Sequence, residues 1–160
     1  MQRKIKGFSL IELVVVIGII TITSGTVLIN FGRYSAERSQ LYENAQILVS
    51  HIRYAQQMTT QGYQTEVRLN ISNSNRFEIW SMRPNIHGNY VLTKIENHIF
   101  SDGIHIASTN VSGGRIRFTN RGSLSDPSST TRLHSQNYRV SITTTIGGGR
   151  VYIHEMERLR

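Results

Sequence analysis

The chain has 160 residues, and its 18 lysines and arginines exceed its 10 aspartates and glutamates, for a formal net charge of +8. This length accommodates one ordinary domain with an appendage, and excludes two full domains. Cysteine is absent, which excludes a disulfide framework, a thiol nucleophile and a thiolate metal site. The positive charge favours attraction to anionic surfaces without naming a partner.

The N-terminus combines a short basic segment with a long apolar one. Arg3, Lys4 and Lys6 lie within the first seven residues, and residues 8–29 form an apolar run of 22 residues whose one charge is Glu12. As a helix this run spans about 30 Å, the thickness of a bilayer core. The preceding positive charges predict a cytoplasmic N-terminus, with the rest of the chain outside.

The position of the processing point distinguishes this segment from a secretory signal. A secretory signal has a shorter apolar core and is cut after it. Here the plausible point, Gly7 between Lys6 and Phe8, precedes the apolar run. Cleavage there would remove residues 1–7 with their three positive charges and leave the hydrophobic helix on the mature protein.

Glu12 is unusual in this setting. A carboxylate within a membrane helix costs about 2.5–3.5 kcal/mol on insertion scales, so it rarely lies there without a partner. One interpretation is a polar residue near the helix end that reaches the headgroups. The other is an ion pair with the N-terminal ammonium of a neighbouring subunit, which would reduce the desolvation cost and fix the stagger between subunits.

The sequence of residues 6–13, KGFSLIEL, resembles the type III signal of type IV prepilins and type II secretion pseudopilins. The resemblance implies that a prepilin peptidase cuts after Gly7 and that the new N-terminal residue, Phe8, is then methylated. It also implies that Glu12 acts in assembly. Residues 8–29 would then be a transmembrane and polymerisation helix.

The helical pattern continues beyond the apolar run. An apolar stripe recurs at steps of three and four residues, as on one face of a helix, and comprises Leu41, Ala45, Leu48, Ile52 and Ala55. Gly62 supplies a stop signal. We therefore expect one helix over residues 8–60, whose amphipathic part, residues 30–60, packs against the remainder of the chain.

From residue 61 onwards the hydrophobic period changes from 3.6 to 2, which predicts a β-rich globular head over residues 61–160. Strands are expected around residues 67–71 and 77–79, and at 90–95, 104–106, 115–119, 138–145 and 150–154. The last two are expected to form a hairpin around Gly147, Gly148 and Gly149. Residues 120–137 are rich in serine and threonine and are expected to form a long loop. The fold class is therefore α+β, with a long helix packed on an antiparallel head.

Short head motifs extend the resemblance to the GspH/FimT group of minor pilins and pseudopilins. They are the helical residues 45–57, the run Ile116-Arg117-Phe118 followed by Gly122, and the strands at 139–145 and 149–153. The resemblance implies a pilin-like fold and a non-enzymatic, structural protein.

The residues themselves give no evidence of catalysis. No G-x-S-x-G elbow is present, and the glycine runs lack the lysine of a phosphate loop. The histidines are scattered without the spacing of a metal site, so we expect neither a metal nor another cofactor, and surface or packing roles for His51, His87, His98, His105, His134 and His154.

Arginines alternate with apolar residues in the later strands. If the apolar residues point to the core, the opposite face is basic and contains one aromatic; it comprises Arg115, Arg117, Arg139, Arg150, Tyr152 and His154. Such a face could bind nucleic-acid phosphates and stack on a base. Some FimT-type minor pilins bind DNA, so the resemblance keeps this alternative open beside a solvated face or a contact with neighbouring subunits.

Three functional hypotheses follow. The first is a structural minor pilin or pseudopilin of a type IV pilus or type II secretion pseudopilus, with prepilin peptidase, other pilins, an inner-membrane assembly platform and membrane lipid as partners. The second is a DNA-binding minor pilin for DNA uptake on the same anchor. The third is a single-pass membrane protein that keeps its leader and forms no polymer.

Overall fold

The computed structural model describes residues 9–71 and 75–159, with the side chains at 25–31 and 33 excepted. One long helix, α1, spans Leu10–Thr60 and precedes all the strands. The chain divides into two compact units after Ala36. From here on, the head denotes the second unit, Glu37–Arg160, which contains the end of α1 in addition to the predicted β-rich residues 61–160.

The head contains two antiparallel sheets. Sheet A has the strand order β3-β2-β1-β5, and sheet B has the order β4-β6-β7-β8, with β9 also paired to β7. The strands of sheet A are β1 (Thr65–Leu69), β2 (Arg76–Pro84), β3 (Tyr90–Ile99) and β5 (Arg115–Arg117). Those of sheet B are β4 (His105–Thr109), β6 (Ser129–His134), β7 (Tyr138–Thr144), β8 (Val151–Ile153) and β9 (Glu157–Arg158). A short 3-10 turn, η1 (Ser112–Gly114), leads into β5.

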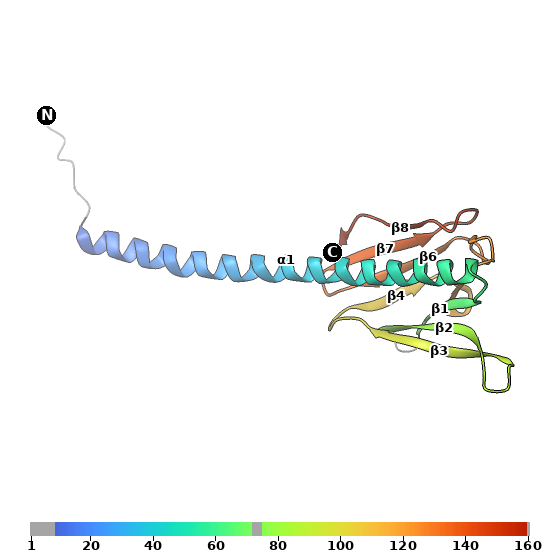
Figure 1. Ribbon diagram of the computed structural model, residues 1–160. Coiled ribbons are helices and arrows are strands. Elements are labelled where there is room, and N and C mark those ends of the chain that lie inside the picture. The colour runs from blue at the N-terminus through green and yellow to red at the C-terminus, as the bar shows by residue number, and fades with distance from the viewer. Residues whose placement is uncertain (1–8, 72–74, 160) are drawn as a thin grey trace, which may run out of the picture. The chain divides into compact units, whose positions relative to one another are not determined.

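The apolar stripe of the head helix is the centre of the core. All five predicted stripe residues have no exposed surface, and they join one cluster with Val67 and Phe77 of sheet A and Val140 and Ile142 of sheet B. Figure 1 shows this segment of α1 lying over the strands, with β1, β2 and β3 below it in this view. The α+β fold class, with a helix packed on an antiparallel head, is confirmed.

The predicted hairpin around the triple glycine is present. Antiparallel β7 and β8 pair through Ile142 and Ile153, and the turn between them lies against the end of α1. There Gln56 donates from Nε2 to the carbonyls of Gly122 (2.6 Å) and Gly148 (3.3 Å). Gly149 has a φ of +55°, and a Cβ on it would collide with the Gln56 amide. The close approach of helix and turn therefore requires glycine.

One element was predicted wrongly. Residues 120–137 were expected to form a loop, but β6 lies within them, paired on both sides in sheet B. Its inward positions include Ser129, Thr131 and Leu133, all buried. Thr131 lies 3.1 Å from the hydroxyl of Thr109 on β4. Serine and threonine occupy the core positions of β6, where their hydroxyls can bond across strands. Because these residues are polar, the sequence of β6 does not show the apolar–polar alternation of a strand.

A carboxylate joins sheet B to the first turn of the head helix. Glu37 accepts hydrogen bonds from the backbone N–H of Asn137 (2.7 Å) and from its Nδ2 (2.8 Å). Burial tends to raise the pKa of Glu37, but the hydrogen bonds from Asn137 and Ser135 outweigh it and hold the pKa below its ordinary value. Glu37 is therefore ionised at neutral pH and caps the β6–β7 turn.

Candidate functional site

The first turn of α1 contains one of the three predicted processing and assembly residues. Ser9 caps the helix, because its Oγ accepts from the N–H of Ile11 at 3.3 Å and its carbonyl accepts from the N–H of Glu12 at 3.1 Å. Glu12 lies in this turn with an exposed side chain. Gly7 and Phe8 lie outside the described residues, so the roles of all three remain predictions.

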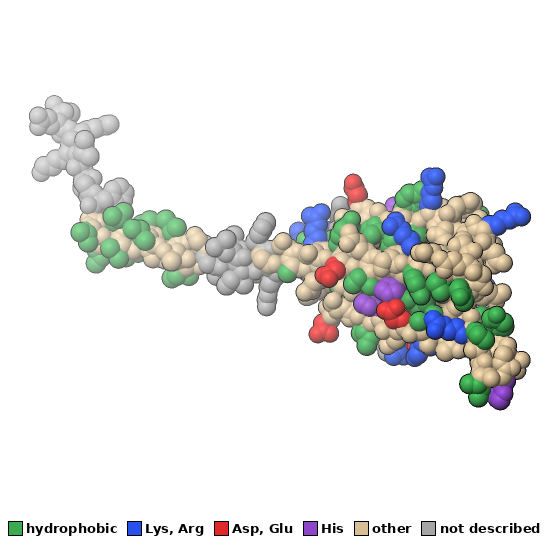
Figure 2. Space-filling model, in the orientation of Figure 1, with side chains coloured by type: hydrophobic (Ala, Val, Ile, Leu, Met, Phe, Trp, Pro, Cys, Tyr) green, Lys and Arg blue, Asp and Glu red, His purple; other side chains and the backbone are tan. Residues whose placement is uncertain are grey.

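The start of α1 exposes an apolar surface, one face of which is seen in Figure 2. Each of its large aliphatic side chains is at least 45% exposed, namely Leu10, Ile11, Leu13, Val14, Val15, Val16, Ile17, Ile19, Ile20 and Ile22. Contiguous apolar surface of this kind marks a site of contact with protein or lipid. In the part of the chain that the structure describes, no helix meets the length and apolarity required of a membrane span.

The six residues of the predicted basic face do not share one sheet. Arg115 and Arg117 lie on β5 of sheet A. Arg139 lies on β7 and Tyr152 on β8, both in sheet B, and Arg150 and His154 lie just before and just after β8. The apolar residues predicted to point to the core do so: Ile116, Phe118, Val140, Ile142 and Val151 are buried, and Ile153 is half-buried against the core. The prediction of one continuous face was wrong because alternation determines which way a side chain points, and not which sheet its strand joins.

Sheet B gathers a different basic cluster on its outer face. A pocket of about 420 Å³ is lined by Ala107, Ser108, Arg132, His134, Arg139, Ser141 and Glu157. Arg132 lies directly opposite Ser141 in the register and donates to the Ser108 hydroxyl at 3.3 Å. Arg139 donates from Nε to Glu157 at 2.7 Å. Two arginines and two hydroxyls thus converge, with one carboxylate among them.

The cluster is electropositive, because its two arginines outnumber its one carboxylate. Burial lowers the pKa of His134, and the positive charges of His105, Arg139 and Arg132 lower it further. The His134 ring lies 6.0 Å from that of His105 on the neighbouring strand. Sequence reasoning missed Arg132 and His134 because β6 was not recognised, although Thr131 and Leu133 alternate with them.

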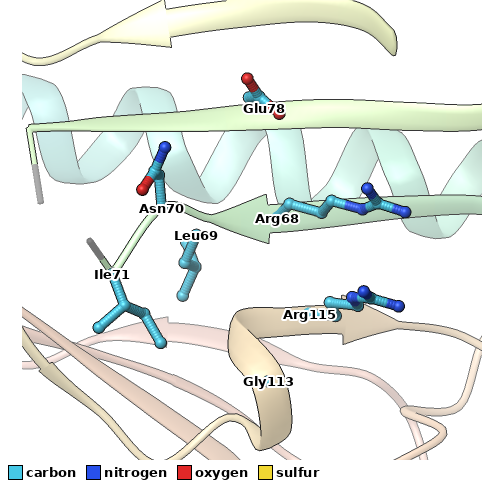
Figure 3. Close-up of a pocket in the computed structure, with 7 residues that line it drawn as sticks. All are labelled: Arg68, Leu69, Asn70, Ile71, Glu78, Gly113 and Arg115. Atoms are coloured by element: carbon cyan, nitrogen blue, oxygen red, sulfur yellow. The ribbon is translucent and has the colours of Figure 1, made fainter. Parts of the chain in front are cut away.

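A second charged surface covers the outer face of sheet A, shown in part in Figure 3. Its pocket of about 390 Å³ is lined by Arg68, Leu69, Asn70, Ile71, Glu78, Gly113 and Arg115. Arg68 lies over the ring of Trp80, with its guanidinium carbon 4.2 Å from the ring centroid, and donates to Glu66 at 2.5 Å. Stacking and ion pairing together hold its guanidinium in place.

The carboxylates of this face are already engaged. Glu78 accepts from Trp80 Nε1 at 2.8 Å and from Lys94 at 3.4 Å. The bond from Trp80 lowers the pKa of Glu78 despite the opposing effect of burial, and Lys94 lowers it further. On the β5 side, Arg117 forms an ion pair with Asp126 at 3.5 Å.

The remaining histidine cluster has a packing role. His51 of α1 and His98 of β3 flank Phe77, with ring centroids 5.2 Å and 5.1 Å from it. Burial lowers the pKa of His98, and the neighbouring His51 lowers it further. These rings extend the aromatic cluster between the helix and sheet A, in accordance with the expected packing role.

Comparison with known proteins identifies the N-terminal segment and the fold. Residues 2–28 match the family model of the prokaryotic N-terminal methylation motif. A search of curated protein sequences gave no match.

Two solved structures share the fold. The type IV minor pilin FimU of Pseudomonas aeruginosa PAO1 has a TM-score of 0.56 and 16% identity, with 74% of this chain and 91% of that one covered. The minor pseudopilin EpsH from the type 2 secretion system of Vibrio cholerae has a TM-score of 0.55 and 9% identity, with coverage of 72% and 96%. The motif confirms the resemblance of the N-terminus to prepilin-like proteins, and the two structures show that the chain shares its fold with a minor pilin and a minor pseudopilin.

Proposed function

We propose that the protein is a structural minor pilin or minor pseudopilin, built into a type IV pilus or a type II secretion pseudopilus after its leader is removed. The observation that carries the proposal is the combination of an N-terminal methylation motif over residues 2–28 with a head of the minor pilin fold. The two structural neighbours are named as a minor pilin and a minor pseudopilin, and neither as an enzyme, which supports a non-enzymatic role.

The physical chemistry of the N-terminus supports the same proposal. The precursor would insert in the inner membrane with Arg3, Lys4 and Lys6 on the cytoplasmic side. A prepilin peptidase would cut after Gly7 and methylate Phe8. The apolar surface of α1 would then leave lipid for contact with other pilins, with Glu12 paired to the ammonium of a neighbouring Phe8. Its partners are thus the peptidase, lipid, the inner-membrane assembly platform and other pilins.

Mass spectrometry of the N-terminal peptide tests this proposal. The protein purified from membranes of cells with a prepilin peptidase is expected to begin at Phe8 and to carry one additional methyl group. A Gly7→Val variant is expected to keep its leader, whereas an Ile5→Val variant is expected to be cut normally. An intact Met1 terminus on the wild-type protein would contradict the proposal and favour a single-pass protein that forms no polymer.

A second candidate function is DNA binding for DNA uptake, and the outer face of sheet B favours it. Arg132, Arg139 and the two serines of its pocket present donors suited to phosphate oxygens. Tyr152 of the same sheet is 46% exposed and available for stacking on a base. Arg115 and Arg117 belong to sheet A and are not part of this candidate site.

DNA binding can be tested by comparing the arginine pair of sheet B, Arg132 and Arg139, with the arginine pair of sheet A, Arg115 and Arg117. With the full chain in detergent micelles, the double variant Arg132→Gln/Arg139→Gln is expected to bind single-stranded DNA about tenfold more weakly and to reduce the salt slope by about 2, because two phosphate contacts are lost. The matched variant Arg115→Gln/Arg117→Gln removes the same charge and is expected to bind as the wild type does. Equal losses in both variants, or no binding at low salt, would exclude a specific DNA site on sheet B.

A further inference from the structure

Two arginines face each other on the outer face of sheet A. Arg68 of β1 and Arg115 of β5 are direct partners in the antiparallel register. Side chains in such positions lie about 5 Å apart at Cβ, and like charges there destabilise a sheet. Figure 3 shows the two side chains running side by side, with their guanidinium ends pointing the same way.

The two arginines differ in how they are held. The Nε of Arg68 is paired with the Glu66 carboxylate, and the Arg68 guanidinium lies over the Trp80 ring. Arg115 is exposed, and within residues 9–71 and 75–159 it takes part in no ion pair. The Arg68 guanidinium is therefore preorganised, and the Arg115 guanidinium is available to bind. An anion placed between them could accept hydrogen bonds from both.

The pocket beside the pair is open and has two kinds of wall. Its polar wall contains Arg68, Arg115, Asn70 and Glu78, and the Glu78 carboxylate is already bonded to Trp80 and Lys94. On its apolar wall the exposed side chain is Ile71, at 56%, because Leu69 is buried in the core. A small molecule would be poorly enclosed in so open a site. Another protein that carries a carboxylate next to an apolar side chain on its surface could contact the polar wall with the first and the apolar wall with the second.

We propose that Arg68 and Arg115 form a carboxylate-binding site that receives an acidic side chain of a partner subunit. A carboxylate accepts two parallel N–H bonds from a guanidinium, and one carboxylate between two arginines removes their repulsion.

The surrounding charges favour a single carboxylate over a phosphate polymer. Glu66, Glu78 and Asp126 are distributed over the same face, each beside a cation. A nucleic-acid backbone laid across it would pass over these carboxylates, and like charges in an interface exclude wrong partners.

The inference rests on the proposed function for the identity of the partner as another filament subunit. The chemistry of the site can nevertheless be tested without assembly. The chain has one tryptophan, and it is Trp80, on which Arg68 stacks. Its fluorescence therefore reports on the pocket directly.

The test uses the full chain in detergent micelles and two capped peptides. In one peptide a glutamate is flanked by leucines, and in the other a glutamine replaces it. We expect a saturable change in Trp80 fluorescence with the glutamate peptide, at about millimolar affinity, and no saturable change with the glutamine peptide. Arg115→Gln is expected to weaken binding about tenfold or more, because charge-assisted hydrogen bonds are lost. Arg121→Gln, which removes an exposed arginine outside the pocket, is expected to leave binding unchanged.

Several outcomes would overturn the proposal. Equal responses to the two peptides would show that the carboxylate is not recognised. Unchanged binding by Arg115→Gln would place the site elsewhere. A stronger response to short single-stranded DNA than to the glutamate peptide would assign the arginine pair to phosphate. N-terminal processing at Phe8 is measured separately, so failure of the peptide test would leave the proposed function intact, and an unprocessed N-terminus would leave the peptide test valid.

Discussion

A Phe77→Ala variant is expected to lose about 3–5 kcal/mol of unfolding free energy, the usual cost of removing a large aromatic from a core. Phe77 has no exposed surface and touches elements from three parts of the head. Its ring centroid lies 5.2 Å from that of His51 on α1, 5.1 Å from that of His98 on β3 and 5.5 Å from that of Phe100 after β3. Alanine would leave a cavity between the helix and sheet A.

Denaturant unfolding of the full chain in detergent, followed by Trp80 fluorescence, measures this loss. Tyr90→Ala is the matched control, because Tyr90 is an aromatic residue of the adjacent strand that is 68% exposed. It is expected to change the unfolding free energy by less than about 0.5 kcal/mol. A Phe77→Ala variant as stable as Tyr90→Ala would show that the head does not use this aromatic cluster as its core.

A Glu12→Val variant is expected to be cut and methylated normally but to disappear from the assembled polymer. Valine removes the insertion cost of a carboxylate, so the variant should reach the membrane at least as well as the wild type. In the polymer, however, the neighbouring ammonium would lose its partner, at a cost of about 3–5 kcal/mol for a buried pair. That corresponds to a decrease of roughly two to four orders of magnitude in the assembly equilibrium.

Shearing, sedimentation and immunoblotting measure the assembled fraction, and the N-terminal peptide mass reports processing in the same cells. Ile11→Val is a suitable control, because it changes a neighbouring exposed side chain without altering charge. Normal amounts of Glu12→Val in the polymer would contradict the pairing of Glu12 with Phe8 and favour the interpretation that Glu12 only reaches the headgroups.

The sequence predicts the helical part of the fold well, because its signals are local. The stripe from Leu41 to Ala55 repeats at the helical period, and the stop signal at Gly62 agrees with the end of α1 at Thr60. The strands follow from alternation wherever the inward residues are aliphatic, as in β7. In β6 the inward residues include Ser129 and Thr131, and a buried hydroxyl cannot be distinguished from a loop hydroxyl without its partner.

The candidate sites were less predictable than the fold, because they depend on pairing between distant strands. Arg115 and Arg139 have the same local pattern but lie in different sheets. Arg68 follows Glu66 in a clear alternation, yet its relation to Arg115 appears only when β1 pairs with β5. The N-terminal motif is the opposite case, since all its residues are adjacent and need no fold to be recognised.

The position of the core residues along the chain also determines when the head can fold. Leu41 is near its start and Val151 near its end, and both belong to the same cluster. The Glu37–Asn137 bonds likewise join residues 100 positions apart. Contacts of such long sequence separation form slowly and late. The amphipathic part of α1 therefore remains uncovered until almost the whole chain has been synthesised, and the head folds only after its last strands have become available.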